Sequence, residues 1–597
     1  MVERGKRVAI AGIGPVGMIV AIELARRGFR PVMLDSKEEL AWSSRAICIS
    51  RRSLEIFRRI GLAPGFFDKA LGWTSGKTFL GDRLVFELRM PQDDSDEFPP
   101  FVNIQQYHTE RFLLDTIEAM DGAIDLRWGH AVTGIHQDEA GARLAVRSNE
   151  GNYSLDCDWV VAADGARSPL REALGLKLDG TSYEGRYMIA DIAVPGVERP
   201  VERHVWFDPV SNPGSTVILH VQPDNIWRID IQLDGREDDT EVLAEKNLLP
   251  RIQSHLDMMG VDAPWRVIWN SVYRAHALSL DAYRHGRTLF AGDAAHLVPI
   301  FGVRGLNSGI DDAHNLGWKL AAVLRGEADE RLLDGYSDER RQATLENLAN
   351  AARSTWFMSP PTPGFRTMRD AVLSLAATRE WARPLINPRQ SAAHRYGVSP
   401  SISQDNDDDG TEGVPPGAVL PSLPLPGDGR RRLHDLLGPD FTLLVFADGL
   451  PPGRLASILA AASARRIATV VIGGDPTTGA SHLPDPDGHL MARLAGGRHP
   501  LYLVRPDEHV AARLSADPAA LEMAMAHALG QGPEFDRKAF VRATDLDGVV
   551  PQTDLEALFA RLSRALDDGD LAADDVEAAK HLFLEGYSAL ANQSDRT

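Results

Sequence analysis

Short apolar runs alternate with helical stretches through the N-terminal part of the chain. Residues 7–11 have the pattern of a buried strand, a glycine-rich turn follows, and the apolar positions of 18–27 share one broad helical face. A second apolar strand, 31–35, ends in an aspartate and completes a βαβ unit. Further helices are expected over 53–60 and 109–120, and strands over 126–128, 144–148 and 159–162. This order predicts a doubly wound α/β domain.

The pattern changes between residues 187 and 233, where four strand-like runs follow one another with little helical periodicity. In the last of them the polar residues Arg228, Asp230 and Gln232 alternate with three apolar ones. Because successive side chains of a strand point to opposite faces, this strand has one polar and one apolar face. We therefore predict an inserted antiparallel sheet whose polar face is available to a ligand.

The second half of the chain predicts a separate C-terminal domain. Helical patterns continue to about residue 383, and residues 403–417 are acidic, rich in Gly and Pro and without periodicity, which is typical of a linker. Three apolar runs, "FTLLVFAD", "ATVVIGGD" and "HPLYLVRPDEHVAAR", then alternate with helical stretches. The predicted units are the first part of a nucleotide-binding domain (1–182), the antiparallel sheet (183–275), the return of the first domain with its helices (276–402), the linker (403–417), a small α/β domain (418–515) and a helical tail (516–597).

Composition limits the possible functions. The 597 residues suffice for several cores, and 64 basic against 84 acidic residues give a net charge of -20, which argues against nucleic-acid and anionic-membrane partners. We find no signal peptide and no apolar run of membrane length, so we expect a cytoplasmic protein. Two cysteines, Cys48 and Cys157, cannot build a disulfide framework or a multi-thiolate metal site, and we expect no metal.

The first motif with chemical content is a glycine-rich turn between the first strand and the first helix. Gly12, Gly14 and Gly17 have the GxGxxG spacing, and Asp35 follows eighteen residues beyond the last glycine. Such glycines let the backbone approach a pyrophosphate at a helix amino terminus, and the acid binds ribose hydroxyls. In this context the motif predicts a dinucleotide, without separating FAD from NAD; the alternative is a structural turn.

Two further motifs place an aspartate beside glycine after a strand. One is "VVAADGARSPLR" with Asp164, and the other is "AGDAAHLVPIFGVRGLNSGIDDAHNLGWKL" with Asp293. The alternatives are an Asp-Gly turn before a solvated basic helix start, and a loop leading to a capped helix.

Together the three motifs resemble those of the flavoprotein aromatic hydroxylases of the para-hydroxybenzoate hydroxylase fold. The stretch "VYRAHALSLDAYRHGRTLFAGDAAHLVPIFGVRGLNSGIDDAHNLGWKLA" resembles the branch of phenol hydroxylase and 3-(3-hydroxyphenyl)propionate hydroxylase more narrowly. The resemblance extends to about residue 400 and, more weakly, to about residue 500. It implies an α/β fold with a doubly wound FAD-binding domain, an inserted antiparallel substrate-binding sheet, and a C-terminal thioredoxin-like domain that here lacks a CxxC motif, before the helical tail.

The resemblance also implies which residues bind the cofactor. Gln106 matches a flavin-contacting glutamine, although Gln105 beside it leaves the register open, and "PIFGVRGLN" departs from the family at Val303 and Arg304. The implied contacts are the FAD pyrophosphate for Ile13, Gly14, Pro15 and Val16, the adenosine ribose for Asp35, the phosphate and ribityl chain for Arg45, the flavin for Gln106, adenine for Val132, the nicotinamide nucleotide and flavin site for Asp164 with Arg167, the ribityl or pyrophosphate for Asp293, and the isoalloxazine edge for the backbone of Gly305, Leu306 and Asn307.

The implied activity is hydroxylation of a phenolic or related aromatic compound. NAD(P)H reduces the flavin, O₂ adds at flavin C4a, and the distal oxygen of the hydroperoxide is transferred to the ring; the cofactor carries this chemistry. The protein must exclude water and favour the phenolate. Among the polar residues offered by the sheet, which include His204 and Arg228, the candidates for phenol activation are His220, Tyr273 and His276, where His276 matches a histidine of relatives.

Other functions stay open on the sequence alone. The same fold can oxidise a larger polyketide or antibiotic, and a flavin-binding interaction protein without turnover would keep the FAD motifs. A halogenase is disfavoured because no Trp-x-Trp-x-Ile-Pro motif is present. We expect a small aromatic substrate and O₂ as partners, and a homodimer. The stretch 543–554 resembles a calcium-binding loop but has Ala at the first ligand position, so we expect no tight calcium site.

Overall fold

The first domain is built on a six-stranded sheet. The computed structural model describes residues 7–531, except 41, 43, 94, 361–362, 387–391, 398, 404–411, 427–430 and 477–479. The strand order is β18-β19-β12-β1-β2-β8, with all neighbours parallel except β18 and β19. The strands are β1 (Val8–Ala11), β2 (Val32–Asp35), β8 (Asp125–Trp128), β12 (Trp159–Ala162), β18 (Arg284–His285) and β19 (Thr288–Phe290).

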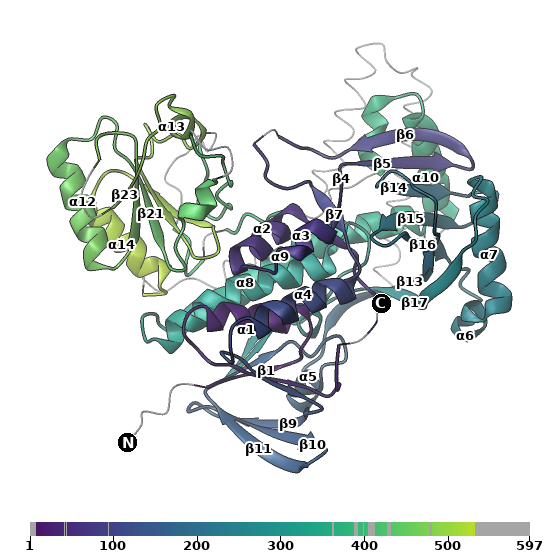
Figure 1. Cartoon of the computed structure of the whole chain (residues 1–597), viewed down its shortest axis with the longest axis horizontal. Helices are drawn as coiled ribbons and strands as arrows, with labels where there is room; N and C mark the ends of the chain where they lie inside the picture. The colour runs from purple at the N-terminus through teal and green to yellow at the C-terminus, as the bar shows by residue number, and fades with distance from the viewer. Residues whose placement is uncertain are drawn as a thin grey trace.

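The helices of the first domain carry the segments that matter for the site (Figure 1). They are α1 (Pro15–Ala25), α2 (Arg51–Ile60), α3 (Gly65–Lys69), α4 (Gln106–Glu118), α5 (Pro169–Ala173), α8 (Gly305–Leu324) and α9 (Arg331–Met358). α1 is buried along most of its length and packs against α8, where Gly317 lets Glu23 approach the α8 backbone. The mixed α/β fold predicted from the alternating pattern is present, with a mainly parallel sheet in this domain.

The antiparallel sheet has eight strands and extends beyond the predicted insertion. Its order is β20-β17-β13-β16-β15-β14-β5-β6, and only β14 and β5 run parallel. β5 and β6 come from far upstream of the insertion, and the predicted boundaries at 182/183 and 275/276 fall inside β13 and β17. The strands are β5 (Ser75–Leu80), β6 (Arg83–Arg89), β13 (Asp179–Ala193), β14 (Arg203–Phe207), β15 (Thr216–Gln222), β16 (Ile226–Gln232), β17 (Arg266–Ser279) and β20 (His296–Leu297).

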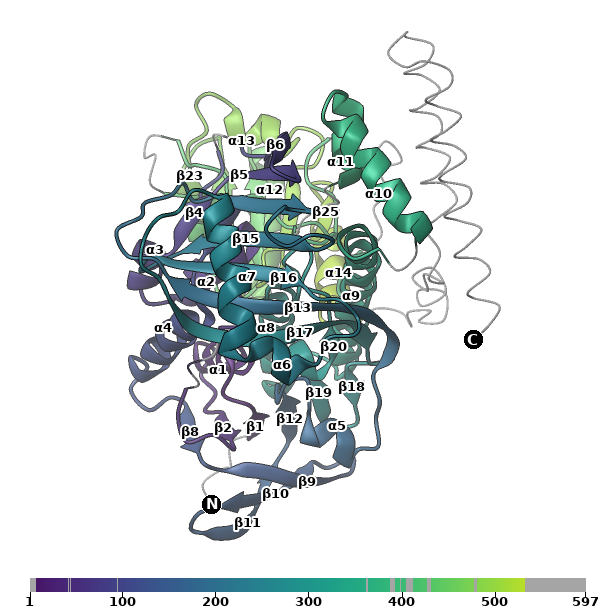
Figure 2. The same ribbon diagram turned by 90° about the vertical axis from the view of Figure 1, so that its right-hand side faces the viewer.

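The outer face of this sheet is covered by helix α7 (Glu245–Met258), with the short α6 (Asp239–Leu243) beside it (Figure 2). Leu248, Ile252 and Leu256 recur at every fourth position and bury one side of α7 against the apolar side chains of β13, β15 and β16. The opposite, inner face of the sheet therefore carries the polar residues and points towards the first domain.

Two small sheets and three further helical segments complete the part of the chain that precedes the linker. β9 (Ala131–Gln137), β10 (Ala142–Ser148) and β11 (Gly151–Cys157) form one antiparallel sheet. β3 (Cys48–Ser50), β7 (Phe101–Asn103) and β4 (Leu71–Trp73) form another. The helical segments are α10 (Pro363–Ala376), η2 (Glu380–Ala382) and α11 (Arg383–Ile386).

The C-terminal domain is a five-stranded mixed sheet in the order β23-β22-β21-β24-β25 (Figure 1). Helix α14 packs on α12 and β25, so it belongs to this domain and not to a tail beginning at 516, as the sequence pattern suggested. The elements are η3 (Leu433–Leu436), β21 (Thr442–Phe446), α12 (Pro452–Ala464), β22 (Ala468–Ile472), β23 (Ser481–Leu483), α13 (His489–Arg493), β24 (Leu501–Val504), β25 (Val510–Leu514) and α14 (Pro518–Ala528). The calcium-loop-like stretch 543–554 lies outside the described residues.

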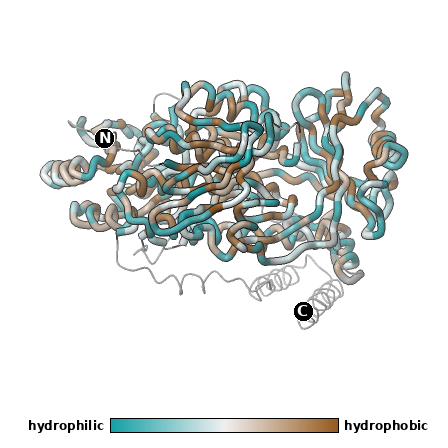
Figure 3. The backbone as a smooth tube through the Cα atoms, turned by 90° about the horizontal axis from the view of Figure 1, so that it is seen from below, coloured by the Kyte–Doolittle hydropathy of each residue, from teal (hydrophilic) through white to brown (hydrophobic). Residues whose placement is uncertain are grey.

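The hydrophobic core runs continuously from the first domain into the C-terminal one. One buried cluster includes side chains of β1, α1 and α8 together with Phe441 and residues of β21 and β24. Trp318 of α8 meets Phe441 edge to face, with ring centroids 5.5 Å apart. In Figure 3 the hydrophobic segments lie mainly inside the fold. Across the described part of the chain, every helix is too short or too polar to cross a membrane.

Candidate functional site

The three motifs meet at one edge of the six-stranded sheet. They follow β1, β12 and β19, which are adjacent and parallel, so their carboxyl ends lie side by side. Val16 of the first motif fills the space where side chains at Gly292 and Gly309 would otherwise project. In open α/β sheets this edge is where ligands bind. Segments from opposite ends of the first domain's sequence are thus combined in one site.

The glycines of the first motif have different structural roles. Gly12 has a φ of 105°, and a Cβ there would overlap the backbone of Ala163. A Cβ at Gly17 would overlap the Gly12 carbonyl. Gly14, in contrast, faces open space at the amino terminus of α1. The packing therefore leaves the backbone at Gly14 and Pro15 accessible, at the positive end of a helix where a pyrophosphate binds.

Asp35 ends β2 next to this turn. Its Oδ2 accepts a hydrogen bond of 2.9 Å from the Ile13 amide, and its carbonyl accepts one of 2.7 Å from the His130 amide. β9 begins directly after His130, and its residue Val132 is half-buried. Asp35 and Val132 thus lie near one another beyond the turn, in an arrangement that suits an adenosine.

The second and third aspartates are both incompletely satisfied by the protein. Asp164 accepts a hydrogen bond of 3.1 Å from the Leu170 amide through Oδ2, while its Oδ1 is buried without a partner. Asp293 is exposed, although Gly292 and Ala294 on either side of it are buried. The surrounding protein atoms desolvate both carboxyl groups and raise the pKa of each. A polar ligand such as a dinucleotide would supply the missing partners.

The third motif leads through a strained loop into α8. Val303 has a φ of 59°, which a β-branched residue rarely adopts, and Arg304 is buried and donates a hydrogen bond of 2.6 Å to Asn347 on α9. Arg304 therefore has a structural contact on the side of α9. Gly305 and Leu306 are half-buried at the amino terminus of the 20-residue helix α8, where the helix dipole favours a partly negative group.

Asn307 fixes this helix end to the strand β3 and helix α2. Its Oδ1 accepts hydrogen bonds from the Ser50 amide at 2.9 Å and the Ser53 hydroxyl at 2.7 Å, and its Nδ2 donates to the Cys48 carbonyl at 3.1 Å. The side chain is therefore fully used within the protein, and only its backbone is available to a ligand.

The two glutamines at the start of α4 face different parts of the molecule. Gln106 accepts a hydrogen bond of 3.0 Å from the Ala46 amide, next to the exposed Arg45. Gln105 donates one of 2.9 Å to the Pro223 carbonyl, beside the antiparallel sheet. Of the two, Gln106 is thus the one that lies beside Arg45.

The polar face of β16 is buried, whereas the sequence suggested an open face. Arg228 forms an ion pair of 2.8 Å with Asp191 on β13 and donates hydrogen bonds to the carbonyls of Ser44 and Arg45. It therefore joins the antiparallel sheet to the segment that carries Arg45. Asp230, two positions further on, is only 7% exposed and its Oδ1 has no hydrogen-bond partner.

The structure does not bring the three candidates for phenol activation together. His220 and Tyr273 lie on the inner face of the sheet, but on β15 and β17, which β16 and β13 separate. His276 contacts Ser182 at 2.9 Å and lies on the outer face, because Arg274, two positions earlier on the same strand, pairs with Asp239 of α6. His276 is therefore separated from the other two candidates.

The electrostatics of the remaining two candidates argue against proton transfer. Burial, reinforced by Arg203 and Arg228, lowers the pKa of His220 to about 3. Burial, with a contribution from Asp293, raises the pKa of Tyr273 well above its usual value, and its hydroxyl donates to the Val298 carbonyl at 3.4 Å. Both side chains remain neutral near pH 7, so they offer hydrogen bonds but no charge.

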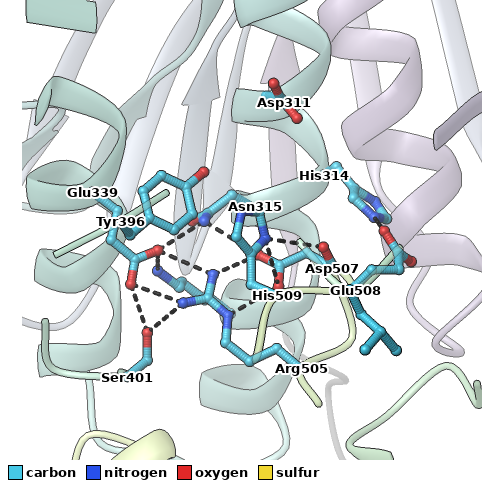
Figure 4. A network of polar contacts seen from close by, with 12 residues as sticks. Asp311, His314, Asn315, Glu339, Tyr396, Ser401, Arg505, Asp507, Glu508 and His509 are labelled. Atoms are coloured by element: carbon cyan, nitrogen blue, oxygen red, sulfur yellow. Dashed lines mark hydrogen bonds and ion pairs between the residues drawn. The ribbon is translucent and has the colours of Figure 1, made fainter. Parts of the chain in front are cut away.

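A buried ionic network connects α8 to the C-terminal domain (Figure 4). Arg505 contacts Glu339 of α9 at 2.9 Å and Asp507 at 2.5 Å, and Asn315 of α8 donates to Asp507 at 3.2 Å. Arg505, Asp507 and Glu508 come from the β24–β25 turn, "RPDEH", which separates two apolar strands. Sequence reasoning missed them, although a charged run inside an apolar stretch is itself a signal.

His314 of α8 extends this network to α1. Its ring nitrogens lie 2.6 Å from Glu23 of α1 and 3.0 Å from Glu508 of the β24–β25 turn. Burial alone would lower the pKa of His314, but the two carboxylates outweigh it and raise the pKa to about 9. A charged imidazolium thus holds together α1, α8 and the C-terminal domain, and α1 and α8 begin at the dinucleotide edge.

Residues 6–351 match the FAD binding domain family, and residues 414–532 match the aromatic-ring hydroxylase C-terminal family. The chain therefore belongs to the FAD-dependent aromatic hydroxylase family, as the three motifs predicted. It is 31% identical to a 3-(3-hydroxy-phenyl)propionate/3-hydroxycinnamic acid hydroxylase of Mycolicibacterium smegmatis, over 61% of this chain and 64% of that protein, which is less than two thirds of its length.

Two further relatives extend the comparison. The chain is 30% identical to a 12-dehydrotetracycline 5-monooxygenase/anhydrotetracycline 6-monooxygenase of Streptomyces rimosus, over 71% of this chain and 82% of that protein. Its fold resembles that of the flavin-dependent monooxygenase PieE in complex with FAD and substrate, with a TM-score of 0.73 and 23% identity over 89% of this chain and 100% of that one.

Proposed function

We propose that this protein is an FAD-dependent monooxygenase that hydroxylates a phenolic or related aromatic compound, with NAD(P)H as reductant and O₂ as oxygen source. The observation that carries the proposal is the meeting of three FAD motifs at one sheet edge, opposite the inner face of an antiparallel sheet. When bound, FAD supplies the electron transfer and oxygen activation that side chains cannot provide.

The amino termini of two helices, α1 and α8, would bind different parts of FAD. Backbone groups of Ile13, Gly14, Pro15 and Val16 would hold the pyrophosphate, and those of Gly305, Leu306 and Asn307 the isoalloxazine edge. The remaining proposed cofactor contacts are Asp35, Arg45, Gln106, Val132, Asp164 and Asp293. Residues 298–304, which lead into α8, are called the flavin loop. Apolar side chains between the antiparallel sheet and this loop, among them Ile218 and Phe301, would exclude water from the reacting ring.

Three finer assignments belong to this proposal. We infer that the C-terminal domain is thioredoxin-like in its mixed sheet and that the protein works as a homodimer in the cytoplasm. The two cysteines of the chain, Cys48 and Cys157, both lie before the C-terminal domain, so this domain has no thiol chemistry of its own. Sedimentation of the FAD-loaded protein would test the dimer directly.

A larger polycyclic substrate is the second candidate. It is supported by the relative that acts on tetracycline precursors, because the chain covers 82% of that protein. Substrate-dependent consumption of NAD(P)H, measured with a panel of simple phenols and one of polycyclic phenols, would separate the two candidates.

The first experiment is the absorbance spectrum of the purified protein. We expect bound flavin, faster oxidation of NADH or NADPH when an aromatic substrate is added, and a product that carries one atom of ¹⁸O from ¹⁸O₂. A protein that binds no FAD after reconstitution, or that binds FAD while no aromatic compound accelerates NAD(P)H oxidation, would contradict the proposal.

A further inference from the structure

A carboxyl group with an unpaired oxygen lies on the inner face of the antiparallel sheet. Asp230 of β16 is 7% exposed and its Oδ1 is buried without a hydrogen-bond partner, while the ion pair beside it joins Arg228 to Asp191. An unsatisfied carboxyl in the interior is unfavourable unless a ligand or a proton compensates it. Such a group points to a missing partner.

The surroundings of Asp230 place it between the sheet and the flavin loop. Its cross-strand neighbours are Ile189 on β13 and Ile218 on β15, and both belong to the apolar cluster that contains Phe301 of the flavin loop. Tyr187, on the same face of β13 as Ile189, contacts the Phe301 ring with centroids 5.2 Å apart. The carboxyl therefore sits in an apolar region bounded by the loop that leads to Gly305.

The charged and titratable groups around Asp230 come from several elements. Burial raises its pKa to about 7, while Arg228 on the same strand opposes this rise and Asp191 on β13 adds to it. Cys48, ahead of α2, and Tyr187 also interact electrostatically with Asp230, and Arg369 of α10 lies beyond Tyr187. The carboxyl thus changes protonation near neutral pH, where a general base is effective.

We propose that Asp230 binds the hydroxyl group of the aromatic substrate and accepts its proton during hydroxylation. The inference rests on the proposed function and names the residue that activates its substrate. In the step assigned to Asp230, the O–H bond of the phenol breaks before the ring carbon attacks oxygen. The proton passes to the Asp230 carboxylate, and the electron pair of that bond moves into the ring, which makes the ring carbon a stronger nucleophile. His220 and Tyr273 then serve as neutral hydrogen-bonding groups.

The binding test titrates phenol and benzoate into the FAD-loaded protein at several pH values between about 5.5 and 8.5. The change in the flavin absorbance spectrum measures the binding of each ligand. Ionised Asp230 accepts a hydrogen bond from phenol and repels benzoate. Phenol binding should therefore strengthen as pH rises through about 7, and benzoate binding should weaken. In D230N we expect phenol to bind about 10-fold more weakly and both pH dependences to disappear.

The turnover test compares D230N with D230E and with the control D234N. Asp234 is exposed and lies just beyond the end of β16. We expect kcat/KM for the aromatic substrate to fall by about 100-fold or more in D230N, to recover partly in D230E, and to stay unchanged in D234N. FAD content and melting temperature report whether each variant is folded. A wild-type pH profile and coupling in D230N would overturn the proposal.

The two proposals fail in different ways. If no aromatic compound stimulates NAD(P)H oxidation by the wild type, the proposed function is wrong, whereas a phenol-binding transition near pH 7 that D230N removes would still support the role of Asp230 in binding. If the wild type hydroxylates an aromatic ring and its phenol binding is independent of pH, the assignment of Asp230 is wrong and the function stands.

Discussion

Two glycines of one turn separate the requirements of folding from those of cofactor binding. Gly12 combines a φ of 105° with close contact to the backbone of Ala163, so any side chain there disturbs the packing of β1 on β12. Gly14 has a φ of -96°, which alanine can adopt, and faces open space. We therefore propose that the space above Gly14 receives the cofactor.

Substituting each glycine by alanine should produce opposite patterns. We expect G12A to lower the free energy of unfolding of the FAD-free protein by about 1–3 kcal/mol, since it introduces strain and overlap. G14A should change this quantity by less than about 0.5 kcal/mol, yet lower the flavin content of the purified protein. Urea unfolding and the flavin-to-protein absorbance ratio measure the two effects. Equal losses of stability in both variants would refute the distinction.

Local rules explain why these positions were predictable from the sequence. Glycine spacing, a following helix and an aspartate at a strand end are all read within one βαβ unit, and the structure has each where the pattern placed it. The environment of Asp230 was not predictable, because its neighbours Ile189, Ile218 and Phe301 come from distant segments. The strain at Val303 was also hidden, since valine itself does not favour a positive φ.

At the scale of elements, one charged histidine, His314, holds α1 and α8 against each other. His314 is buried between Glu23 and Glu508, and Glu508 also pairs with Arg52 of α2 at 3.0 Å. Both helices begin at the proposed cofactor site, so we expect the distance between the two proposed binding surfaces to depend on this link.

The histidine makes stability depend on pH in a defined direction. The folded pKa of about 9 lies above the ordinary value of about 6.5, so the stabilisation is complete below pH 6.5 and is lost as pH rises through 9. We expect H314Q to be roughly 3 kcal/mol less stable than the wild type at pH 6, and this gap to narrow towards pH 9. Chemical denaturation at several pH values measures it, with H489Q, on the exposed face of α13, as control. A difference in unfolding free energy between H314Q and the wild type that does not change with pH would exclude a role for the charge of His314.

The elements themselves were predicted unevenly. The strands β1, β2, β12, β21, β22 and β24 follow apolar runs and were found at their expected places. Helix α7 was not predicted, because Pro250 lies within it and helical interiors disfavour proline; packing of Leu248, Ile252 and Leu256 on the sheet compensates. The limits of β13 and β17 were missed because sheet pairing extends strands across boundaries that composition suggests.

At the scale of the whole molecule, the two domains share a core and a buried network of charges. Breaking such a network from one side leaves uncompensated charges in the interior, which is strongly unfavourable. We therefore expect the FAD-loaded protein to unfold in a single calorimetric transition. The van't Hoff enthalpy of this transition should equal its calorimetric enthalpy. E508Q should separate this transition into two, while E522Q, which removes a surface pair with Arg465, should not. Two transitions in the wild type would show that the domains unfold independently.

The position of Glu508 along the chain also affects how the protein is made. A ribosome synthesises the cofactor-binding segments long before residues 505–509, so the nascent chain exposes Arg52, Arg59 and His314 without their carboxylate partner. Flavin bound at that stage would contact helices α1 and α8 before Glu508 has paired with His314. Tight retention of the cofactor should therefore begin only after residues 505–509 have been synthesised, and chains interrupted before residue 505 should be released without bound flavin.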